Sequence, residues 1–113
     1  MLPRYQRVIK DSDWRRIHAR GSAVHSSYFV VKKLPNKNKD SRFGISIGVK
    51  VSKQATRRNQ IKRQLRAIIQ QEAGRIKTSY DIIFIVRPAI LQAKFSEIRK
   101  QVINTFSKAK LYK

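Results

Sequence analysis

Hydrophobic positions recur along the chain at two spacings, and the shorter spacing predicts strands. Apolar and small residues alternate over residues 42–50, which is typical of a strand with two different faces. Residues 28–34 predict an earlier strand, and a run of polar turn residues separates the two. Residues 81–86 form a further strand, because Asp81 is followed by an unbroken apolar run that indicates cover on both faces, and Pro88 ends it.

The longer spacing, three and four residues apart, predicts amphipathic helices. The first covers residues 13–20, with Ser12 as its N-cap and Gly21 as its stop. The second covers residues 57–76, with Thr56 as its N-cap. Each helix therefore begins after a polar residue able to accept a backbone hydrogen bond.

Each predicted helix has one apolar face for a core. In the first helix, Trp14, Ile17 and His18 share a face. The second helix has an apolar stripe of Ile61, Leu65, Ile68, Ile69 and Ile76. A third helix, residues 95–108, has a stripe of Phe95, Ile98, Val102 and Phe106.

The elements follow one another in the order α-β-β-α-β-α, within a single domain of residues 1–113. Three strands in one small sheet, with helices packed on it, predict an α/β (α+β) two-layer sandwich. Residues 1–10 and 108–113 are basic, and we expect them to be flexible ends.

One face of the strand at residues 42–50 is formed by unusually small residues. Gly44, Ser46 and Gly48 share this face with Lys50, and the bulky apolar residues point the other way. A face of such low relief leaves room for a ligand, but it equally allows a helix to pack closely over the glycines. The strand alone leaves both interpretations open.

Charge narrows the possible partners. The 27 Lys and Arg residues against 6 Asp and Glu residues give a net charge of +21, which opposes compaction unless a polyanion binds. No apolar run is long enough for a membrane-spanning helix, and residues 1–11 lack the apolar stretch of a signal peptide. Cysteine is absent. We therefore expect a cytoplasmic protein that binds nucleic acid and no membrane.

The second helix concentrates this charge, because residues 41–71 contain no acidic side chain. One helical stripe consists of Asn59, Lys62, Arg63, Arg66 and Gln70. Like charges at these spacings repel, so the stripe is unfavourable unless a polyanion lies along it. A solvated basic face is the structural alternative, but such a face normally includes acidic residues for pairing.

The string at residues 58–66 reads R-N-x-x-K-R-x-x-R, and it resembles the signature helix of the bacterial ribonuclease P protein family. The resemblance extends over nearly the whole chain. Arg7, the helix with Trp14, the strand ending in Lys32, residues 43–46 and residues 80–82 occur in the order found in the family.

The resemblance implies a subunit of a ribonucleoprotein in which an RNA removes the 5′ leader of precursor tRNA. It implies a sandwich with a left-handed βαβ crossover, against the usual handedness. The residues implied to contact the catalytic RNA are Arg57, Arg58, Asn59, Lys62, Arg63 and Arg66.

The resemblance also implies a cleft between the first helix and the sheet that holds the leader. The candidate cleft residues are Trp14, His18, Tyr28, Lys32, Ser46 and Lys50. In a strand Tyr28 and Phe29 point to opposite faces, so only one of them can line the cleft. His18 and Lys32 stand where the family usually has aromatic residues.

The residues needed for a protein nuclease are scarce. His18 and His25 fall on different predicted elements, and Asp11 and Asp13 form the only close acidic pair. We therefore predict that the protein alone is inactive. Mg²⁺ is expected in the holoenzyme, held mainly by RNA, and no obligate protein partner is inferred. A ribosomal or other structural RNA-binding protein is the alternative function.

Overall fold

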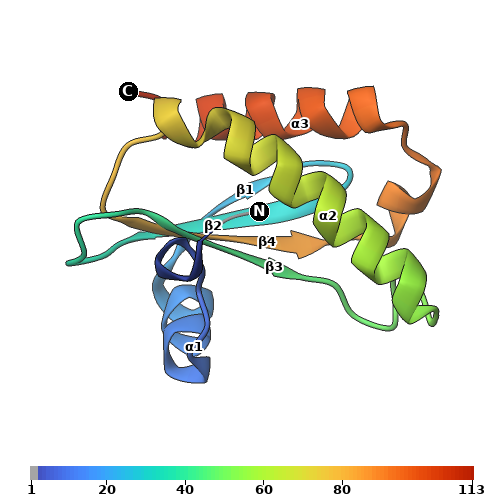
Figure 1. The fold of residues 1–113 in the computed structure, drawn as a ribbon, viewed down its shortest axis with the longest axis horizontal. Helices are drawn as coiled ribbons and strands as arrows, with labels where there is room; N and C mark the ends of the chain where they lie inside the picture. The colour runs from blue at the N-terminus through green and yellow to red at the C-terminus, as the bar shows by residue number, and fades with distance from the viewer. Residues whose placement is uncertain (1–2) are drawn as a thin grey trace.

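The computed structural model describes residues 3–113 (Figure 1). Its elements in chain order are η1 (Arg4–Gln6), α1 (Asp11–Arg20), β1 (Ser22–His25), β2 (Phe29–Pro35), β3 (Arg42–Ser46), α2 (Ala55–Glu72), η2 (Ala73–Arg75), β4 (Tyr80–Val86), η3 (Pro88–Gln92) and α3 (Phe95–Lys108).

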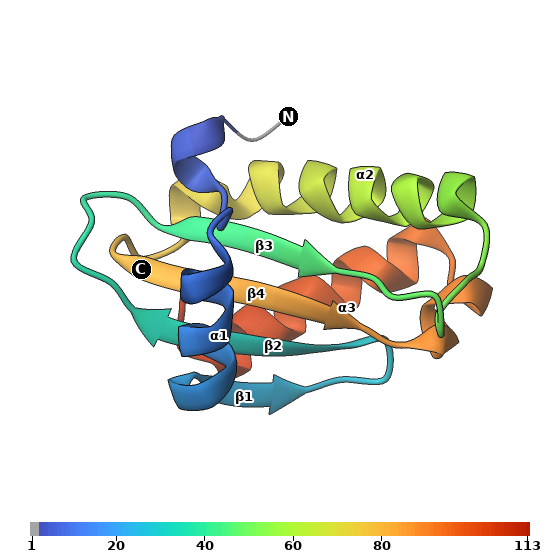
Figure 2. The same cartoon turned by 90° about the horizontal axis from the view of Figure 1, so that it is seen from below.

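The four strands form one sheet in the order β1-β2-β4-β3. β2 pairs antiparallel with β1 and β4, whereas β3 and β4 are parallel and are joined through α2. Helices α2 and α3 cover one face of the sheet, and α1 crosses the other (Figures 1 and 2). Figure 2 shows the sheet from the side of α1, where β4 lies to the right of β3 once the parallel strands are turned to point up. From the opposite side, where α2 lies, β4 is therefore to the left of β3. The crossover is therefore left-handed, as the resemblance implied.

Strand β1 is absent from the predicted order. Its residues, Ser-Ala-Val-His, are mostly exposed and pair only with β2, because β1 is the edge of the sheet. A short, polar edge strand has no buried face, so it shows no alternation that the sequence could reveal.

Strand β3 is shorter than expected, since it ends at Ser46 rather than Lys50. It is the other edge of the sheet, and its pairing with β4 stops where Ser46 meets Ile85. The chain then leaves the sheet toward α2, and Val49, predicted to point inward, is 67% exposed. Residues 47–50 have no partner strand, so their alternating apolar side chains do not form a buried face.

The core lies mainly between the sheet and helices α2 and α3. Phe84 on the central strand packs edge-to-face with Phe29 and Phe106, at ring-centroid distances of 5.2 and 5.8 Å. The predicted stripe is buried, but α2 ends at Glu72 rather than at residue 76, so Ile76 lies beyond the helix, after η2. Phe95 is an exception, because it is 42% exposed at the first position of α3, where a side chain points back beyond the helix.

The helix starts differ from the predictions by two residues. Helices α1 and α2 begin at Asp11 and Ala55, so Ser12 and Thr56 lie inside the first turns and are not N-caps. The residues before the two helices make no side-chain cap. Gly21 does end α1, and its N–H donates to the Ile17 carbonyl at 2.8 Å.

The expected flexible ends are largely packed. Leu111 is fully buried, Tyr112 pairs with Ile76, and the Lys113 N–H donates to Arg75 at 2.9 Å. Toward the other end, Val8 is buried and its N–H donates to the Phe43 carbonyl at 2.9 Å. Residues 111–113 and Val8 therefore contact the rest of the fold, while residues 1 and 2 lie outside the described residues.

Candidate nucleic-acid interface

The outer face of α2 carries cations that have no internal partner. Asn59, Lys62, Arg63 and Arg66, together with Thr56, line one shallow groove along the helix. Among residues 3–113, these first four side chains make no hydrogen bond or ion pair. Their face is separate from the buried stripe, as the sequence predicts. Four donors thus remain available for an external acceptor such as phosphate.

The two arginines near the start of α2 differ from these four. Arg57 donates to the Leu91 carbonyl at 3.0 Å, and Arg58 donates to the Ser52 carbonyl at 2.8 Å. Both arginines border the apolar stripe, so they reach the loops that flank the start of α2. They brace these loops, and each guanidinium keeps further N–H groups that the loops do not use.

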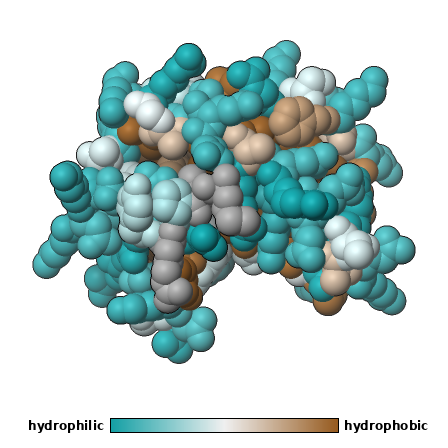
Figure 3. All heavy atoms as spheres, in the orientation of Figure 1, coloured by the Kyte–Doolittle hydropathy of each residue, from teal (hydrophilic) through white to brown (hydrophobic). Residues whose placement is uncertain are grey.

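A groove runs from α1 across β3 to α2. It consists of two adjoining depressions that share Trp14 and Ile45. One reaches α2 at Arg66, and the other reaches α2 at Lys62 and also includes Ser46. The groove therefore joins two predicted cleft residues to two predicted RNA-contact residues. Hydrophilic residues predominate on the face seen in Figure 3, where the surface is notched beside the projecting α1.

The small face of β3 is covered at one end and open at the other. A Cβ atom on Gly44 would lie 2.6 Å from the Trp14 ring, so α1 packs directly over this glycine. A Cβ atom on Gly48 would meet nothing closer than 4.0 Å. Close helix packing is thus confirmed at Gly44, whereas the segment at Gly48 is uncovered.

Trp14 is held in place and yet remains partly accessible. Its Nε1 donates to the Val8 carbonyl at 3.2 Å, and its ring lies 6.2 Å from that of exposed His18. Lys32 donates to the His18 carbonyl at 2.9 Å, which places Lys32 on the same side of the sheet. Trp14, His18 and Lys32 therefore gather around α1, but of these three only Trp14 lines the groove.

Two other predicted cleft residues lie elsewhere. The Tyr28 hydroxyl donates to Glu97 of α3 at 3.3 Å, on the opposite side of the sheet from α1, and Phe29 is buried against Phe84. Neither lines the cleft, because residue 28 precedes β2 in a turn where strand alternation does not apply. Lys50 is exposed in the turn after β3 and lines neither depression.

A buried ionic network, which the sequence did not predict, fixes α1 on the sheet. The fully buried Asp81 carboxylate accepts two hydrogen bonds from Arg42, at 2.8 and 2.7 Å, and one each from Arg16 and Asn36. Arg42 and Arg16 also contact Asp13 of α1. Burial alone would raise the pKa of Asp81, but these hydrogen bonds and the arginine charges hold it below its ordinary value. The only sign of this network in the sequence is Asp81, an acidic residue at the start of an otherwise apolar run.

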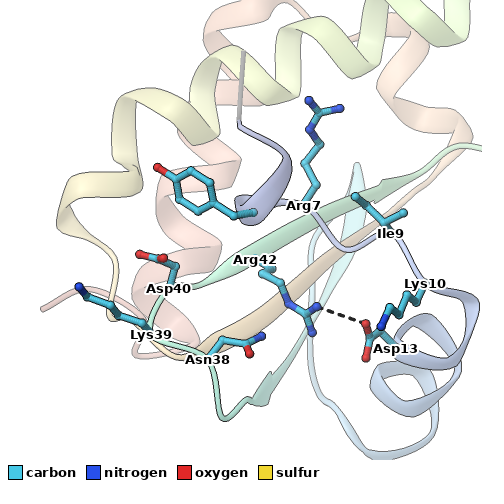
Figure 4. Close-up of a pocket in the computed structure, with 9 residues that line it drawn as sticks. Arg7, Ile9, Lys10, Asp13, Asn38, Lys39, Asp40 and Arg42 are labelled. Atoms are coloured by element: carbon cyan, nitrogen blue, oxygen red, sulfur yellow. Dashed lines mark hydrogen bonds and ion pairs between the residues drawn. The ribbon is translucent and has the colours of Figure 1, made fainter.

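Another depression lies beyond the groove, between the N-terminal segment, α1 and the loop before β3 (Figure 4). It measures about 680 Å³ and shares Arg7 with the groove. Its cations include Lys39 and Arg42, but Asp13 and Asp40 lie among them. These carboxylates make it less suited to a phosphate than the face of α2.

The described residues contain no group of three or more His, Cys, Asp or Glu side chains placed to hold a metal ion. Among the helices of residues 3–113, none has the length and apolar character needed to cross a membrane. The surface features that remain as candidates are the basic face of α2 and the groove beside it.

Comparisons with known proteins agree with these features. The family model described as Ribonuclease P matches residues 2–110. The ribonuclease P protein component of Synechocystis is 33% identical over 109 residues, covering 96% of this chain and 88% of that protein. The component from Clostridioides difficile is 38% identical over 96 residues, covering 84% and 83%.

A solved structure of the Staphylococcus aureus ribonuclease P protein superposes with a TM-score of 0.87 at 31% identity, covering 96% of this chain and 98% of that one. The alternative of a ribosomal protein is not favoured by any of these matches. The family model covers nearly the whole chain, and relatives more than 30% identical match most of their own length, so the chain belongs to the bacterial ribonuclease P protein family.

Proposed function

We propose that the protein binds the catalytic RNA of ribonuclease P through the outer face of α2. The observation that carries this proposal is that Asn59, Lys62, Arg63 and Arg66 share one face without an internal partner among the described residues. Repulsion between these cations is relieved when phosphates lie along the helix, and the guanidinium groups match phosphate oxygens in geometry.

The groove beside α2 is proposed to hold the single-stranded 5′ leader of precursor tRNA. Single-stranded RNA exposes base faces and Watson–Crick edges, which proteins bind by stacking and hydrogen bonding. Trp14 offers an aromatic surface there, Ser46 offers a hydroxyl, and Lys62 and Arg66 offer charges for the backbone. The groove opens onto the RNA-binding face of α2, so one substrate strand can lie beside the catalytic RNA.

The cleavage chemistry is proposed to belong to the RNA. His18 lies on α1, whereas His25 lies on β1 with its ring 3.4 Å from Arg87, so the two histidines form no acid–base pair. The described residues do not offer a tight metal site, so the Mg²⁺ of the holoenzyme is proposed to be held mainly by RNA. A cytoplasmic location follows from this role.

Reconstitution tests this division of labour. The protein alone is expected not to cleave precursor tRNA at any Mg²⁺ concentration, whereas protein added to the RNA should permit cleavage at lower Mg²⁺, because its cations reduce repulsion between two RNAs. The measurement is cleavage of one labelled substrate by protein, RNA and both, across Mg²⁺ and salt.

The same titrations report on the leader. If the protein neutralises about four leader phosphates, the log–log dependence of substrate affinity on salt should steepen by roughly 3, since each single-strand phosphate contributes about 0.7. Cleavage at the mature 5′ end by RNA-free protein would overturn the proposal, as would an unchanged Mg²⁺ requirement.

Trp14→Ala is expected to weaken binding of leader-bearing precursor and to spare mature tRNA. Loss of one base–aromatic stack corresponds to about 1–3 kcal/mol. The melting temperature should also fall, because the ring packs on Gly44 and bonds to Val8. Trp14→Phe serves as the control, since it keeps an aromatic face but removes the Nε1 donor. Binding assays with both tRNAs would reject stacking by this residue if Trp14→Ala weakened both equally.

A further inference from the structure

One carboxylate lies in the otherwise basic and aromatic groove. Asp11, at the first position of α1, lines the depression formed by Trp14, Ile45, Ser46, Ile47 and Lys62. A carboxylate repels phosphate, so its presence in a groove for RNA is unfavourable unless it contacts another part of the nucleotide.

Asp11 also differs from most of the acidic residues in having no partner. Asp13 and Asp81 pair with arginines, Glu72 accepts a hydrogen bond from Tyr112, and Glu97 accepts one from Tyr28. Within residues 3–113, the Asp11 side chain takes part in no hydrogen bond or ion pair. Its acceptor oxygens are therefore free for a ligand in the groove.

The groups around Asp11 are arranged to separate the two parts of a nucleotide. Lys62 projects from α2 and attracts phosphate, whereas Asp11 projects from α1 and accepts hydrogen bonds only. Trp14 supplies a surface for a base. The depression is shallow and open, with a volume of about 340 Å³, so a base on a single strand can reach it from solvent.

We propose that Asp11 reads the Watson–Crick edge of one leader base and thereby gives the protein a preference for guanine. Guanine presents two adjacent N–H groups, which a carboxylate accepts in a bidentate pair. Adenine and cytosine present one amino group beside an acceptor nitrogen, and uracil presents one N–H between two carbonyl oxygens that repel a carboxylate. The expected order is guanine first and uracil last. This inference rests on the proposed binding of the leader in the groove.

The test measures binding of precursor tRNAs to the reconstituted holoenzyme. Each leader position carries each of the four bases in turn, and mature tRNA serves as the leader-free reference. The protein is wild type, Asp11→Ala, Asp11→Asn or Asp40→Ala. Asp40→Ala is the matched control, because it removes another carboxylate without a side-chain partner among the described residues, one that lies outside the groove.

Wild type and Asp40→Ala are expected to favour guanine over uracil about tenfold at one leader position, a factor that equals 1.4 kcal/mol. Asp11→Ala should reduce that preference to within twofold, and Asp11→Asn should shift it toward uracil, because an amide donates as well as accepts. Affinity for mature tRNA should stay unchanged in every variant.

An unchanged base preference in Asp11→Ala would overturn the inference. If affinity for all leaders rose uniformly in this variant, Asp11 would be only an unfavourable charge. If its melting temperature fell instead, Asp11 would have only a role at the helix N-terminus. Leader-bearing and mature substrates that bind wild type equally would instead refute leader binding itself.

Discussion

Replacing Lys62, Arg63 and Arg66 together by alanine is expected to weaken binding to the catalytic RNA by about 3 kcal/mol, more than 100-fold. Each charge-assisted bond to phosphate contributes about 1 kcal/mol or more, and these side chains give up no internal bond when they are removed. The slope of log affinity against log salt should also fall by about 2 to 3.

Folding should be unaffected or slightly improved in this triple variant, because three mutually repelling cations leave the surface of α2. A matched variant with alanine at the exposed Lys37, Lys77 and Lys100 loses the same charge away from the signature face. Filter binding over a range of salt concentrations compares the two. Equal losses would mean that only net charge matters, and unchanged affinity in the first variant would refute binding through α2.

Asp81→Ala is expected to destabilise the fold by about 3–5 kcal/mol, because it leaves Arg42 partly buried without its bidentate partner. The Arg42 side chain is only 18% exposed, so water cannot fully replace the lost contacts. Urea unfolding measures the change. Asp40→Ala serves as the control, since its side chain has no partner among the described residues, and it should change stability by no more than about 0.5 kcal/mol.

The Asp81 network also predicts how stability depends on pH. The pKa of Asp81 in the folded protein lies below the ordinary value of 3.8, so the contribution of this carboxylate to stability is fully present above that value. The contribution is lost as pH falls from that value through the lower, folded pKa, because in this range the unfolded chain binds more protons than the folded one. Wild type and Asp81→Asn should therefore converge in stability under acid conditions, and a constant difference down to pH 2 would contradict this assignment.

The basic face of α2 and the identity of the core could be predicted from the sequence, because both depend on local spacing. Ile61, Leu65, Ile68 and Ile69 follow the helical repeat, and all four are buried. The four free side chains of the signature follow the same repeat on a neighbouring face. A helix keeps its angular order wherever it packs, so its two stripes are determined before the tertiary structure forms.

Other features depended on contacts between distant segments. Tyr28 faces α3 rather than α1 because a turn precedes β2, and the C-terminal residues are ordered because Tyr112 pairs with Ile76. No local sequence pattern predicts either contact. Strand β1 likewise exists only because β2 offers its free edge, since its own residues bury little.

The groove depends both on local sequence and on contacts between distant segments. Sequence placed Trp14 on an apolar helix face and small residues on β3, but it left open whether a helix or a ligand covers them. The tertiary structure decided this, since Asp81, Arg42 and Asp13 hold α1 over Gly44 and leave the segment from Ser46 to Gly48 uncovered. Side-chain type and periodicity are properties of a segment, whereas a groove is the space between segments, and only long-range packing sets that space.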